Sequence, residues 1–322
     1  MRVFQGYQDL PADARGASVA LGNFDGLHAG HRAVIDAATR AGASTGAPLG
    51  VVLFDPPPRR FFQPEAPSFR VMTPRARERA LRDLGVDLLF VLPFNADIAA
   101  MSDAQFAKDV LADGLGVSAV SVGFDFQFGK GRMGDVVSLK AHGERLGFTT
   151  EVAERVADGV DKASSSAIRD RIASGDVAAA ARMLGGLWTV DAEVEGGEKR
   201  GRTIGFPTAN LRLGRIIHPA HGVYAVWTRL DGEAHWRPGV ANFGRTPTTG
   251  ERDPLLEVNV FNFDGDLYDR RLHVAFVDFL RAERKFDGLD ALKAQIAADA
   301  EDARIRLEAG GPPPAPLLDG EA

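Results

Sequence analysis

Short apolar runs alternate with helical patterns along the first half of the chain. The apolar runs predict strands at residues 18–24, 49–54, 87–94, 119–124 and 148–156. The helical patterns cover residues 31–43, 73–85, 102–114, 135–147 and 165–184, the last interrupted near Gly175. Strands and helices that alternate at these lengths form crossover units and a parallel sheet, which binds ligands at the carboxyl ends of its strands. We therefore expect the chemistry of this half in the loops after residues 24, 54, 94 and 124.

The pattern changes at Gly185 and Gly186, after which apolar and polar residues alternate with the period of two that is typical of strands. Strands are predicted at residues 188–195, 222–230, 235–243, 257–263 and 267–279. Asp-Gly pairs separate the second of these strands from the third and the fourth from the fifth, and this dipeptide is a strong hairpin signal. Successive hairpins predict an antiparallel sheet or small barrel.

Length and patterning together divide the chain. At roughly 100–200 residues per domain, the 322 residues suggest two domains. We predict an α/β domain at residues 1–185 and an all-β domain at residues 186–309 that ends in an amphipathic helix at 289–307. The last segment, residues 310–322, is rich in proline and glycine, which predicts a disordered tail.

Composition narrows the classes of function. Lys and Arg number 38 against 44 Asp and Glu, a net charge of −6, which argues mildly against a nucleic-acid partner. The absence of cysteine excludes disulfides, thiolate zinc sites and cysteine nucleophiles. Residues 1–20 do not resemble a secretory signal, and no apolar stretch approaches the ~20 residues that span a bilayer. We expect a cytoplasmic protein without a membrane partner.

The first candidate site is residues 22–31 (GNFDGLHAGH), where a predicted strand ends and a helix begins. Its glycines let the backbone approach a ligand closely, and the helix N-terminus offers N–H groups to an anion. His28 and His31 share a face of the helix, so both imidazoles can donate hydrogen bonds to phosphate oxygens. A histidine alone would more often be a surface residue or a satisfied polar group. Zinc is the weaker alternative, since no cysteine is present and no third ligand is obvious.

Two further segments of the first half offer polar groups. Ser165 and Ser166 lie at a predicted helix start, where hydroxyls and N–H groups serve phosphate, and Arg169 one turn later can add a bidentate contact. The plainer interpretation is a serine cap with a surface arginine. Residues 123–129 offer Asp125 and aromatic rings suited to an adenine or flavin ring, or else a strand end with a buried phenylalanine.

The second candidate site is residues 201–210 (GRTIGFPTAN). The chain contains neither a P-loop pattern nor a protein-kinase signature, so a kinase here must belong to another class. Gly205 is flexible and Pro207 is rigid. Thr208 and Asn210 alternate along an extended segment and face the same way. A hydroxyl and an amide oxygen are hard ligands suited to Mg²⁺, although an ordinary polar turn has the same composition.

Residues 22–31 resemble the extended His-x-Gly-His signature of bacterial bifunctional riboflavin kinase/FAD synthetases. Other segments resemble that family's motifs in the same order: residues 54–59 (FDPPPR), 122–129 (VGFDFQFG), 164–169 (SSSAIR), 205–210 (GFPTAN), 239–247 (GVANFGRTP) and 284–286 (RKF). The resemblance covers nearly the whole chain. It implies a Rossmann-like nucleotidyltransferase domain followed by a small antiparallel riboflavin-kinase barrel with a C-terminal helix.

The resemblance also implies two ATP-dependent reactions. Riboflavin is phosphorylated to FMN, and FMN is adenylylated to FAD with release of pyrophosphate. The implied cofactor is Mg²⁺, and the implied partners are the small molecules riboflavin, FMN, FAD and ATP. We expect a monomer or weak homo-oligomer.

Site residues follow from the matched motifs. In the first domain, His28, His31 and Arg169 are implied to stabilise charge on the ATP phosphates. The implied nucleotide-binding residues are Gly22, Asn23, Phe24, Asp25, Gly30, Gly123, Asp125, Phe128, Ser165 and Ser166. In the second domain, the implied ATP and Mg²⁺ residues are Gly205, Pro207, Thr208 and Asn210. Glu257 matches the position of the family's general base, although on sequence alone it could be a solvent-facing strand residue. Arg284 and Phe286 are implied to lie near the flavin.

Two positions depart from the family's pattern. Pro57 stands where histidine is usual and removes a polar side chain near the first site, whereas Ser166 replaces threonine and keeps the hydroxyl. Two other functions fit the sequence less well. A nucleotidyltransferase for pantetheine phosphate or nicotinamide mononucleotide would not need residues 205–210, and a flavin-binding regulatory module would not need the intact His28 and Glu257.

Overall fold

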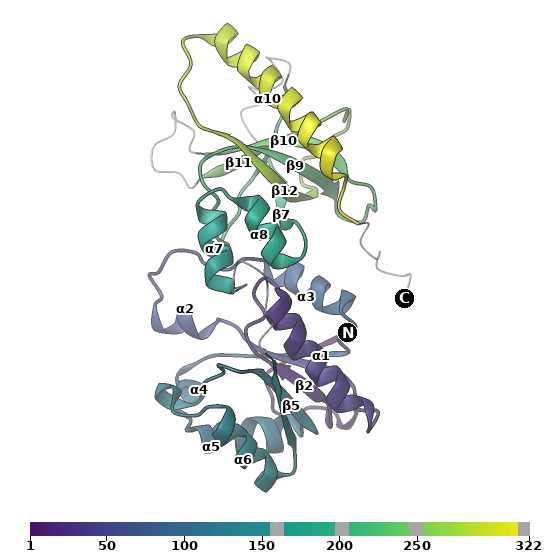
Figure 1. Ribbon diagram of the computed structural model, residues 1–322, viewed down its shortest axis with the longest axis vertical. Coiled ribbons are helices and arrows are strands. Elements are labelled where there is room, and N and C mark those ends of the chain that lie inside the picture. The colour runs from purple at the N-terminus through teal and green to yellow at the C-terminus, as the bar shows by residue number, and fades with distance from the viewer. Residues whose placement is uncertain (155–163, 197–205, 245–253, 315–322) are drawn as a thin grey trace. The chain divides into compact units, whose positions relative to one another are not determined.

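The chain forms two compact units in the computed structural model, which describes residues 1–154, 164–196, 206–244 and 254–314 (Figure 1). The first unit consists of Met1–Pro67 and Arg77–Ala163, and the second of Ser68–Ala76 and Ser164–Ala322. A short piece of the N-terminal half of the sequence therefore belongs to the second unit.

The first unit contains a six-stranded parallel sheet in the order β1-β4-β3-β2-β5-β6. The strands are β1 (Arg2–Gln5), β2 (Ser18–Leu21), β3 (Leu49–Phe54), β4 (Leu88–Leu92), β5 (Ala119–Gly123) and β6 (Thr149–Ala153). The predicted parallel sheet is confirmed, and β1 is an addition. The chain runs outward from β2 to β4 and then returns to place β5 on the other side of β2. This reversal is a topological switch point, where parallel sheets bind ligands.

Helices connect these strands. They are η1 (Ala12–Ala14), α1 (Ala29–Ala43), α2 (Pro58–Phe62), α3 (Pro74–Asp83), α4 (Ala96–Ala100), α5 (Asp103–Gln105), η2 (Phe106–Leu115), η3 (Lys130–Arg132) and α6 (Val136–Leu146). Thr73 caps α3 as predicted, because its Oγ1 accepts from the backbone N–H of Ala76 at 3.1 Å. The helix predicted at 102–114 begins with a capping box between Ser102 and Gln105, but from Phe106 onward it is a π-helix.

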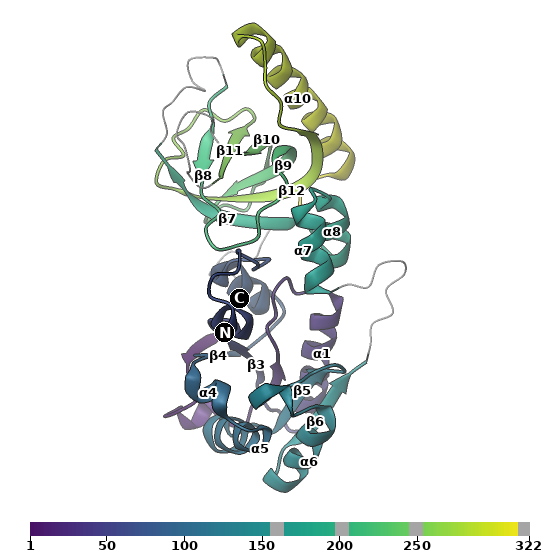
Figure 2. The same cartoon turned by 90° about the vertical axis from the view of Figure 1, so that its left-hand side faces the viewer.

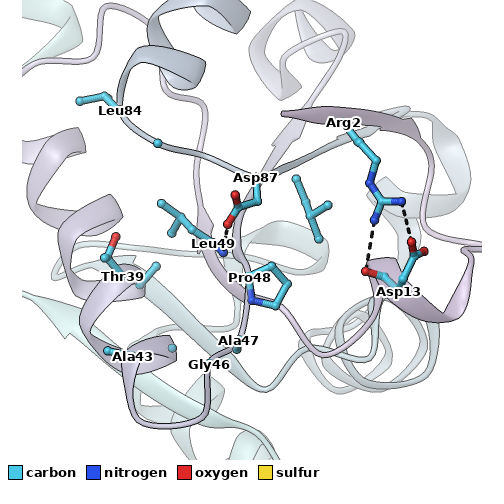
Figure 3. A pocket seen from close by; sticks show the side chains of 14 residues that line it. Arg2, Asp13, Thr39, Ala43, Gly46, Ala47, Pro48, Leu49, Leu84 and Asp87 are labelled. Atoms are coloured by element: carbon cyan, nitrogen blue, oxygen red, sulfur yellow. Dashed lines mark hydrogen bonds and ion pairs between the residues drawn. The ribbon is translucent and has the colours of Figure 1, made fainter. Parts of the chain in front are cut away.

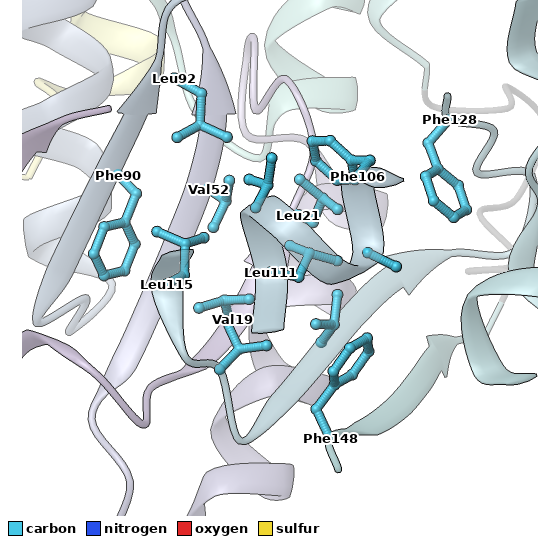
Figure 4. Packing of buried hydrophobic residues seen from close by; sticks show 14 of the residues in the cluster. Val19, Leu21, Val52, Phe90, Leu92, Phe106, Leu111, Leu115, Phe128 and Phe148 are labelled. Atoms are coloured by element: carbon cyan, nitrogen blue, oxygen red, sulfur yellow. The ribbon is translucent and has the colours of Figure 1, made fainter. Parts of the chain in front are cut away.

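The core of the first unit lies between the sheet and η2 (Figure 4). Val19 and Leu21 of β2 pack with Leu111 and Leu115 of η2. All four residues of β2 are buried, as expected for a parallel strand covered on both faces. Near its end, α1 approaches β2 closely, since a Cβ at Gly42 would lie 3.0 Å from the Ser18 Cβ.

The second unit contains a closed barrel in the order β10-β11-β8-β7-β12-β9 (Figure 2). The strands are β7 (Trp188–Glu195), β8 (Ala209–Leu211), β9 (Gly222–Leu230), β10 (Arg237–Gly244), β11 (Leu255–Val260) and β12 (Arg271–Ala282). The predicted hairpin of β9 and β10 is confirmed. The hairpin predicted at Asp264-Gly265 is wrong, because β12 pairs with β7 and β9 and not with β11. Barrel closure, and not the local turn, decides the partners of β12.

Three helices accompany the barrel: α7 (Ser165–Ala173), α8 (Val177–Leu184) and α10 (Leu289–Gly310). The predicted interruption between α7 and α8 is confirmed at Gly175, whose φ is 86°. Helix α8 packs on β7 and β12, and α10 on β9, β10 and β12. Helix α10 ends three residues later than predicted, and residues 315–322 of the predicted tail lie outside the described residues.

Residues 68–76 are attached to the barrel by side chains as well as backbone. The Trp188 Nε1–H donates to the Val71 carbonyl at 2.7 Å, and the Thr73 hydroxyl donates to Asp191 at 2.7 Å. Arg70 forms a β-bridge with Ile216. Within the described residues, no helix is long and apolar enough to cross a membrane.

Candidate active sites

The first candidate site is the turn between β2 and α1. His28 is the N-cap of α1, which therefore begins two residues earlier than predicted, and His31 lies in its first turn. The two imidazole rings stack with centroids 3.9 Å apart. A Cβ at Gly30 would lie 3.1 Å from His28 Cε1, so glycine makes room for the ring. The structure thus brings together the two histidines that the sequence selected, at the N-terminus of a helix.

Backbone strain marks the same turn. Phe24 and Leu27 have φ values of 48° and 46°, a region that bulky residues rarely adopt. Both side chains are buried, and the Phe24 ring lies 5.4 Å from that of His31, so packing holds the strained conformation. Asp25 is also buried, whereas Asn23 is exposed and Gly22 lies against the Phe24 ring. Such strain concentrates at ligand sites.

The loop that begins at Gly123 follows β5, the neighbour of β2 across the switch point. Asp125 is exposed. Phe128 is buried in the core of the first unit, and Phe126 stacks on it at 5.6 Å. The third ring of this loop, that of Phe124, is 44% exposed and is therefore the most accessible of the three to a ligand.

A phenylalanine cluster that the sequence analysis missed lies at the carboxyl ends of β3 and β4. Its members are Phe54, Phe61, Phe62, Phe94 and Phe106, with neighbouring ring centroids 5.2–6.1 Å apart. Phe62 is 65% exposed although it is large and apolar. The adjacent pair Phe61-Phe62, one residue beyond the FDPPPR segment, is the sequence signal that could have found it.

Pro57 and its neighbours shape the start of the helix that carries these rings. Pro57 is the N-cap of α2 and gives it no side-chain cap hydrogen bond. Asp55, two residues earlier, lies 4.0 Å from the guanidinium of Arg77. Arg77 is buried, and the sequence analysis did not select it. A buried arginine among carboxyl-end loops is a second source of positive charge in this unit.

The third motif of the first half lies in the second unit. Ser164 is the N-cap of α7, and its Oγ accepts from the Ala167 N–H at 3.2 Å. Ser165 and Ser166 occupy the first turn, one residue inside the predicted cap. The Arg169 Nε–H donates to the Phe69 carbonyl at 2.6 Å, and the guanidinium lies 5.4 Å from the Phe69 ring. Arg169 is thus held by residues 68–76.

The second candidate site lies on three adjacent barrel strands. Glu257 of β11 is directly opposite Asn210 of β8 and Asn242 of β10. Directly opposed residues share a face of the sheet. Thr208 immediately precedes β8, and the Asn259 amide donates to the Pro207 carbonyl at 2.7 Å. Gly205 lies outside the described residues.

Burial controls the chemistry of Glu257. Desolvation raises the pKa of its carboxyl, and the negative charge of Glu283 acts in the same direction. A hydrogen bond from Asn242 opposes this, but the net result is a raised pKa. Glu257 is therefore a stronger base than an exposed glutamate, as a proton acceptor requires.

The Asn210 side chain has an unusual feature. Its Oδ1 is buried and has no hydrogen-bond partner among the described residues. A buried amide oxygen without a donor costs free energy unless a ligand satisfies it. This oxygen therefore fits a hard cation such as Mg²⁺.

Arg284 and Phe286, expected near the flavin, follow the end of β12. The Phe286 ring lies 5.0 Å from the Arg284 guanidinium and 5.7 Å from that of Arg281. Arg284 also donates to Gln295 of α10. The hydrogen bond attaches the segment to α10. Both guanidinium groups lie within the range of a cation–π contact with the Phe286 ring.

Two cavities differ in their relation to these sites. One of about 850 Å³ is lined by Arg2, Leu49 and Leu88, at the amino ends of β1, β3 and β4 (Figure 3). It lies at the opposite edge of the sheet from the stacked histidines, so we assign it no catalytic role. One of about 300 Å³ is lined by Pro207, Thr208 and several residues after β11, and thus adjoins the second candidate site.

The fold and the two sites define a two-part class of transferase, a nucleotidyltransferase-type sheet joined to a kinase-type barrel. The profile of the FAD synthetase family matches residues 10–167, and that of the riboflavin kinase family matches residues 184–307. The chain belongs to the bifunctional riboflavin kinase/FMN adenylyltransferase family. The predicted family, fold class and pair of activities are confirmed, and both activities consume ATP.

Individual relatives cover almost the full length. The bifunctional riboflavin kinase/FMN adenylyltransferase of Pseudomonas fluorescens is 42% identical and covers 94% of this chain and 97% of its own. The protein of the same description from Escherichia coli (strain K12) is 37% identical with the same coverage. A crystal structure described as a macrolide-efflux protein from Streptococcus pneumoniae superposes with a TM-score of 0.83 at 30% identity, covering 94% of this chain and 98% of that chain.

Proposed function

We propose that the barrel phosphorylates riboflavin with Glu257 as the general base, and that the site around His28 and His31 adenylylates FMN. The observation that carries the proposal is that His28 and His31 lie in the first unit, whereas Thr208, Asn210 and Glu257 lie together in the second. The domain boundary near residue 185 remains part of the proposal.

In the kinase reaction, Glu257 accepts the proton of the riboflavin 5′-hydroxyl as that oxygen attacks the γ-phosphorus of ATP. The raised pKa of Glu257 suits this task, because it increases the carboxylate's affinity for the proton. The bond from the γ-phosphorus to the β,γ-bridging oxygen breaks, and ADP leaves.

Thr208 and Asn210 are the residues that would hold Mg²⁺ beside the ATP phosphates. The buried, unpartnered Asn210 Oδ1 supports this assignment. When bound, the ion supplies neutralisation of phosphate charge. The cavity of about 300 Å³ next to Thr208 is a candidate seat for the nucleotide.

In the adenylyl transfer, an FMN phosphate oxygen attacks the α-phosphorus of ATP and pyrophosphate leaves. The nucleophile is already an anion, so no base is needed. His28 and His31 can donate hydrogen bonds to phosphate oxygens at the N-terminus of α1, where the dipole favours negative charge. The backbone of Gly22 and the exposed Asp125 and Asn23 complete the proposed nucleotide surface.

The phenylalanine cluster is a candidate seat for the flavin ring of FMN. Phe62 offers an exposed aromatic face, and stacking on such a face requires no hydrogen bonds. Phe62→Ala is expected to raise the KM for FMN about tenfold, which corresponds to the ~1.4 kcal/mol of an aromatic pair. Kinase kinetics with riboflavin serve as the control. An unchanged KM for FMN would remove the cluster from the proposed site.

The phosphate-binding role of Arg169 is proposed from the family resemblance alone. The guanidinium of Arg169 is engaged with Phe69, so its role as a phosphate clamp has no separate geometric support. A cytoplasmic location, the absence of a nucleic-acid partner and a monomer or weak homo-oligomer remain predictions.

The test of the proposed function is chromatographic. Purified protein with riboflavin and Mg²⁺·ATP should yield FMN and then FAD, and with FMN and Mg²⁺·ATP should yield FAD and pyrophosphate. Formation of FMN alone would leave a kinase and overturn the adenylyltransferase. Formation of neither product by folded protein would reduce the chain to a flavin-binding module.

A further inference from the structure

A second carboxylate lies next to the proposed kinase base. Glu283 follows the end of β12, and its Oε1 accepts from the Asn242 Nδ2–H at 3.3 Å. Asn242 is the residue directly opposite Glu257 across β10 and β11. An asparagine amide nitrogen carries two N–H donors, so one amide can serve both carboxylates. Because directly opposed residues share a face of the sheet, the Asn242 amide lies on the same face as the Glu257 carboxylate, and its effect is to lower the pKa of Glu257 against the larger effect of burial.

The position of Glu283 depends on its neighbours on two other strands. A Cβ at Gly244 of β10 would overlap the Glu283 carboxylate, so any larger residue at 244 would displace it. The other carboxylate oxygen, Oε2, lies 3.6 Å from His221 Nδ1, just before β9. The His221 ring contacts that of Phe243, with centroids 5.5 Å apart. The carboxylate thus has a defined seat even though its side chain is 37% exposed.

The two arginines near Glu283 in the sequence are engaged with α10. Arg281 pairs with Asp299 of α10 at 2.6 Å, and Arg284 donates to Gln295 of the same helix. Among the described residues, the His221 imidazole is the side chain that pairs with Glu283, with Nδ1 3.6 Å from Oε2. Asn210 from β8 and Asn242 from β10 are the groups directly opposite Glu257 in the sheet.

We propose that Glu283 is a positioning residue for the kinase: it orients the Asn242 amide, which in turn holds the Glu257 carboxylate toward the riboflavin 5′-hydroxyl. This inference rests on the proposed role of Glu257 as the base. Glu283 itself exchanges no proton with the substrate. Its carboxylate oxygen accepts one N–H of the Asn242 amide, so the other N–H remains to face Glu257.

The experiment compares Glu283→Gln, Glu283→Ala and Asn242→Ala in the full chain, with Glu308→Gln as a control that removes one exposed carboxylate from α10. Kinase kcat and the KM for riboflavin are measured at one fixed pH. Glu283→Gln keeps an acceptor oxygen for the Asn242 amide, so kcat falls less in this variant than in Glu283→Ala. Glu283→Ala loses the acceptor, and kcat falls about 3- to 10-fold with KM unchanged. The double variant Glu283→Ala/Asn242→Ala has the same kcat as Asn242→Ala alone, because the two residues act through one interaction.

Several outcomes would overturn the proposal. A loss of kcat in Glu283→Gln as large as that in Glu283→Ala would refute the acceptor role of Glu283. A loss in Glu283→Ala that appears in KM or in thermal stability and not in kcat would assign Glu283 a structural role. Glu257→Gln is assayed in parallel. A normal kinase rate in that variant would refute the base assignment itself, whereas an inactive Glu257→Gln with unaffected Glu283 variants would refute only the positioning role.

Discussion

At the scale of the residue, Glu257 shows how the barrel prepares a carboxylate for proton transfer. Burial destabilises the charged form, and a single amide donor only partly compensates for it. The cross-strand neighbours of Glu257 are two asparagines and no cation. A salt bridge at either position would lower the pKa and weaken the base.

We predict that Glu257→Gln lowers kinase kcat by about 10²–10⁴, the usual contribution of a general base. The amide keeps the size and hydrogen bonding of the side chain but does not accept the proton. FAD synthesis from supplied FMN should be unchanged, because that reaction belongs to the other candidate site. Rates with riboflavin and, separately, with FMN distinguish this from misfolding, in which both activities would fall. A normal kinase rate would mean that Glu257 is only a strand residue.

The stacked histidines give a second prediction at this scale. Replacing both His28 and His31 with Ala should abolish FAD formation from FMN and spare FMN formation from riboflavin. Loss of one preorganised donor typically costs about 10²–10³ in rate, so the loss of two leaves little. His235→Ala, which removes an exposed histidine from the second unit, is the control. Near-normal FAD synthesis by the double variant would contradict the phosphate-binding role.

At the scale of the element, a polar link joins α5 to α6. His142 Nε2 lies 2.9 Å from Asp103 Oδ2, and Arg145 Nη2 lies 2.5 Å from His142 Nδ1. Arginine only donates, so Nδ1 accepts and the proton is on Nε2, which donates to Asp103. The loop that follows β5 packs against Asp103 as well, since a Cβ at Gly134 would overlap the Asp103 side chain.

This link predicts a pH-dependent contribution to stability. The hydrogen bond from His142 lowers the pKa of Asp103 below its ordinary 3.8. A lowered pKa in the folded state stabilises the fold above pH 3.8, and that contribution is lost as the pH falls through the folded-state pKa. Asp103→Ala should therefore lower the free energy of unfolding by about 1–2 kcal/mol at pH 7 and by less at pH 3. Thermal unfolding at both pH values measures this, with the exposed Asp36→Ala as the control. An equal loss at both pH values would point to packing instead.

Most elements were predictable because their signals are local. Glycine at 175 broke a helix, Ser102 and Thr73 began helices, and continuous apolar runs marked buried parallel strands. The elements that were missed or misassigned depend on distant residues. Strand β8 has three residues and exists because β7 and β11 flank it, and β12 takes its partners from barrel closure. Hydrophobic periodicity does not distinguish η2, a π-helix, from an α-helix.

The site residues also divide into those that a local motif identifies and those that only the folded chain identifies. The motifs selected His28, His31, Asn210 and Glu257, and the structure gives the contacts within each group. Asn242 and Glu283 were not selected, because neither belongs to a motif with a chemical signature. Their relation to Glu257 exists only once β10, β11 and the end of β12 are side by side.

At the scale of the whole molecule, the kinase barrel does not consist only of the C-terminal part of the sequence. Residues 68–76 contribute the carbonyl that binds the Trp188 indole and the hydroxyl that binds Asp191. Arg75 of the same segment pairs with Asp231 at 2.5 Å. Trp188 and Asp191 are buried, so loss of these partners would leave a buried indole N–H and a buried carboxylate with fewer hydrogen bonds.

The last prediction concerns a fragment that starts near Gly186. Such a fragment keeps every barrel strand and the proposed kinase residues, so it should convert riboflavin to FMN and make no FAD. It lacks α7, α8 and residues 68–76, and each lost partner of a buried polar group costs about 1–3 kcal/mol. We therefore expect a thermal midpoint clearly below that of the second unit in the full chain. A fragment from Ser164, which restores α7 and α8, should recover part of the difference, and a synthetic peptide of residues 68–76 should raise the midpoint further. A Gly186 fragment as stable as the full chain would show that residues 68–76 contribute nothing to the barrel. A folded but inactive fragment, judged by circular dichroism, would show that the kinase needs more than the C-terminal part of the chain.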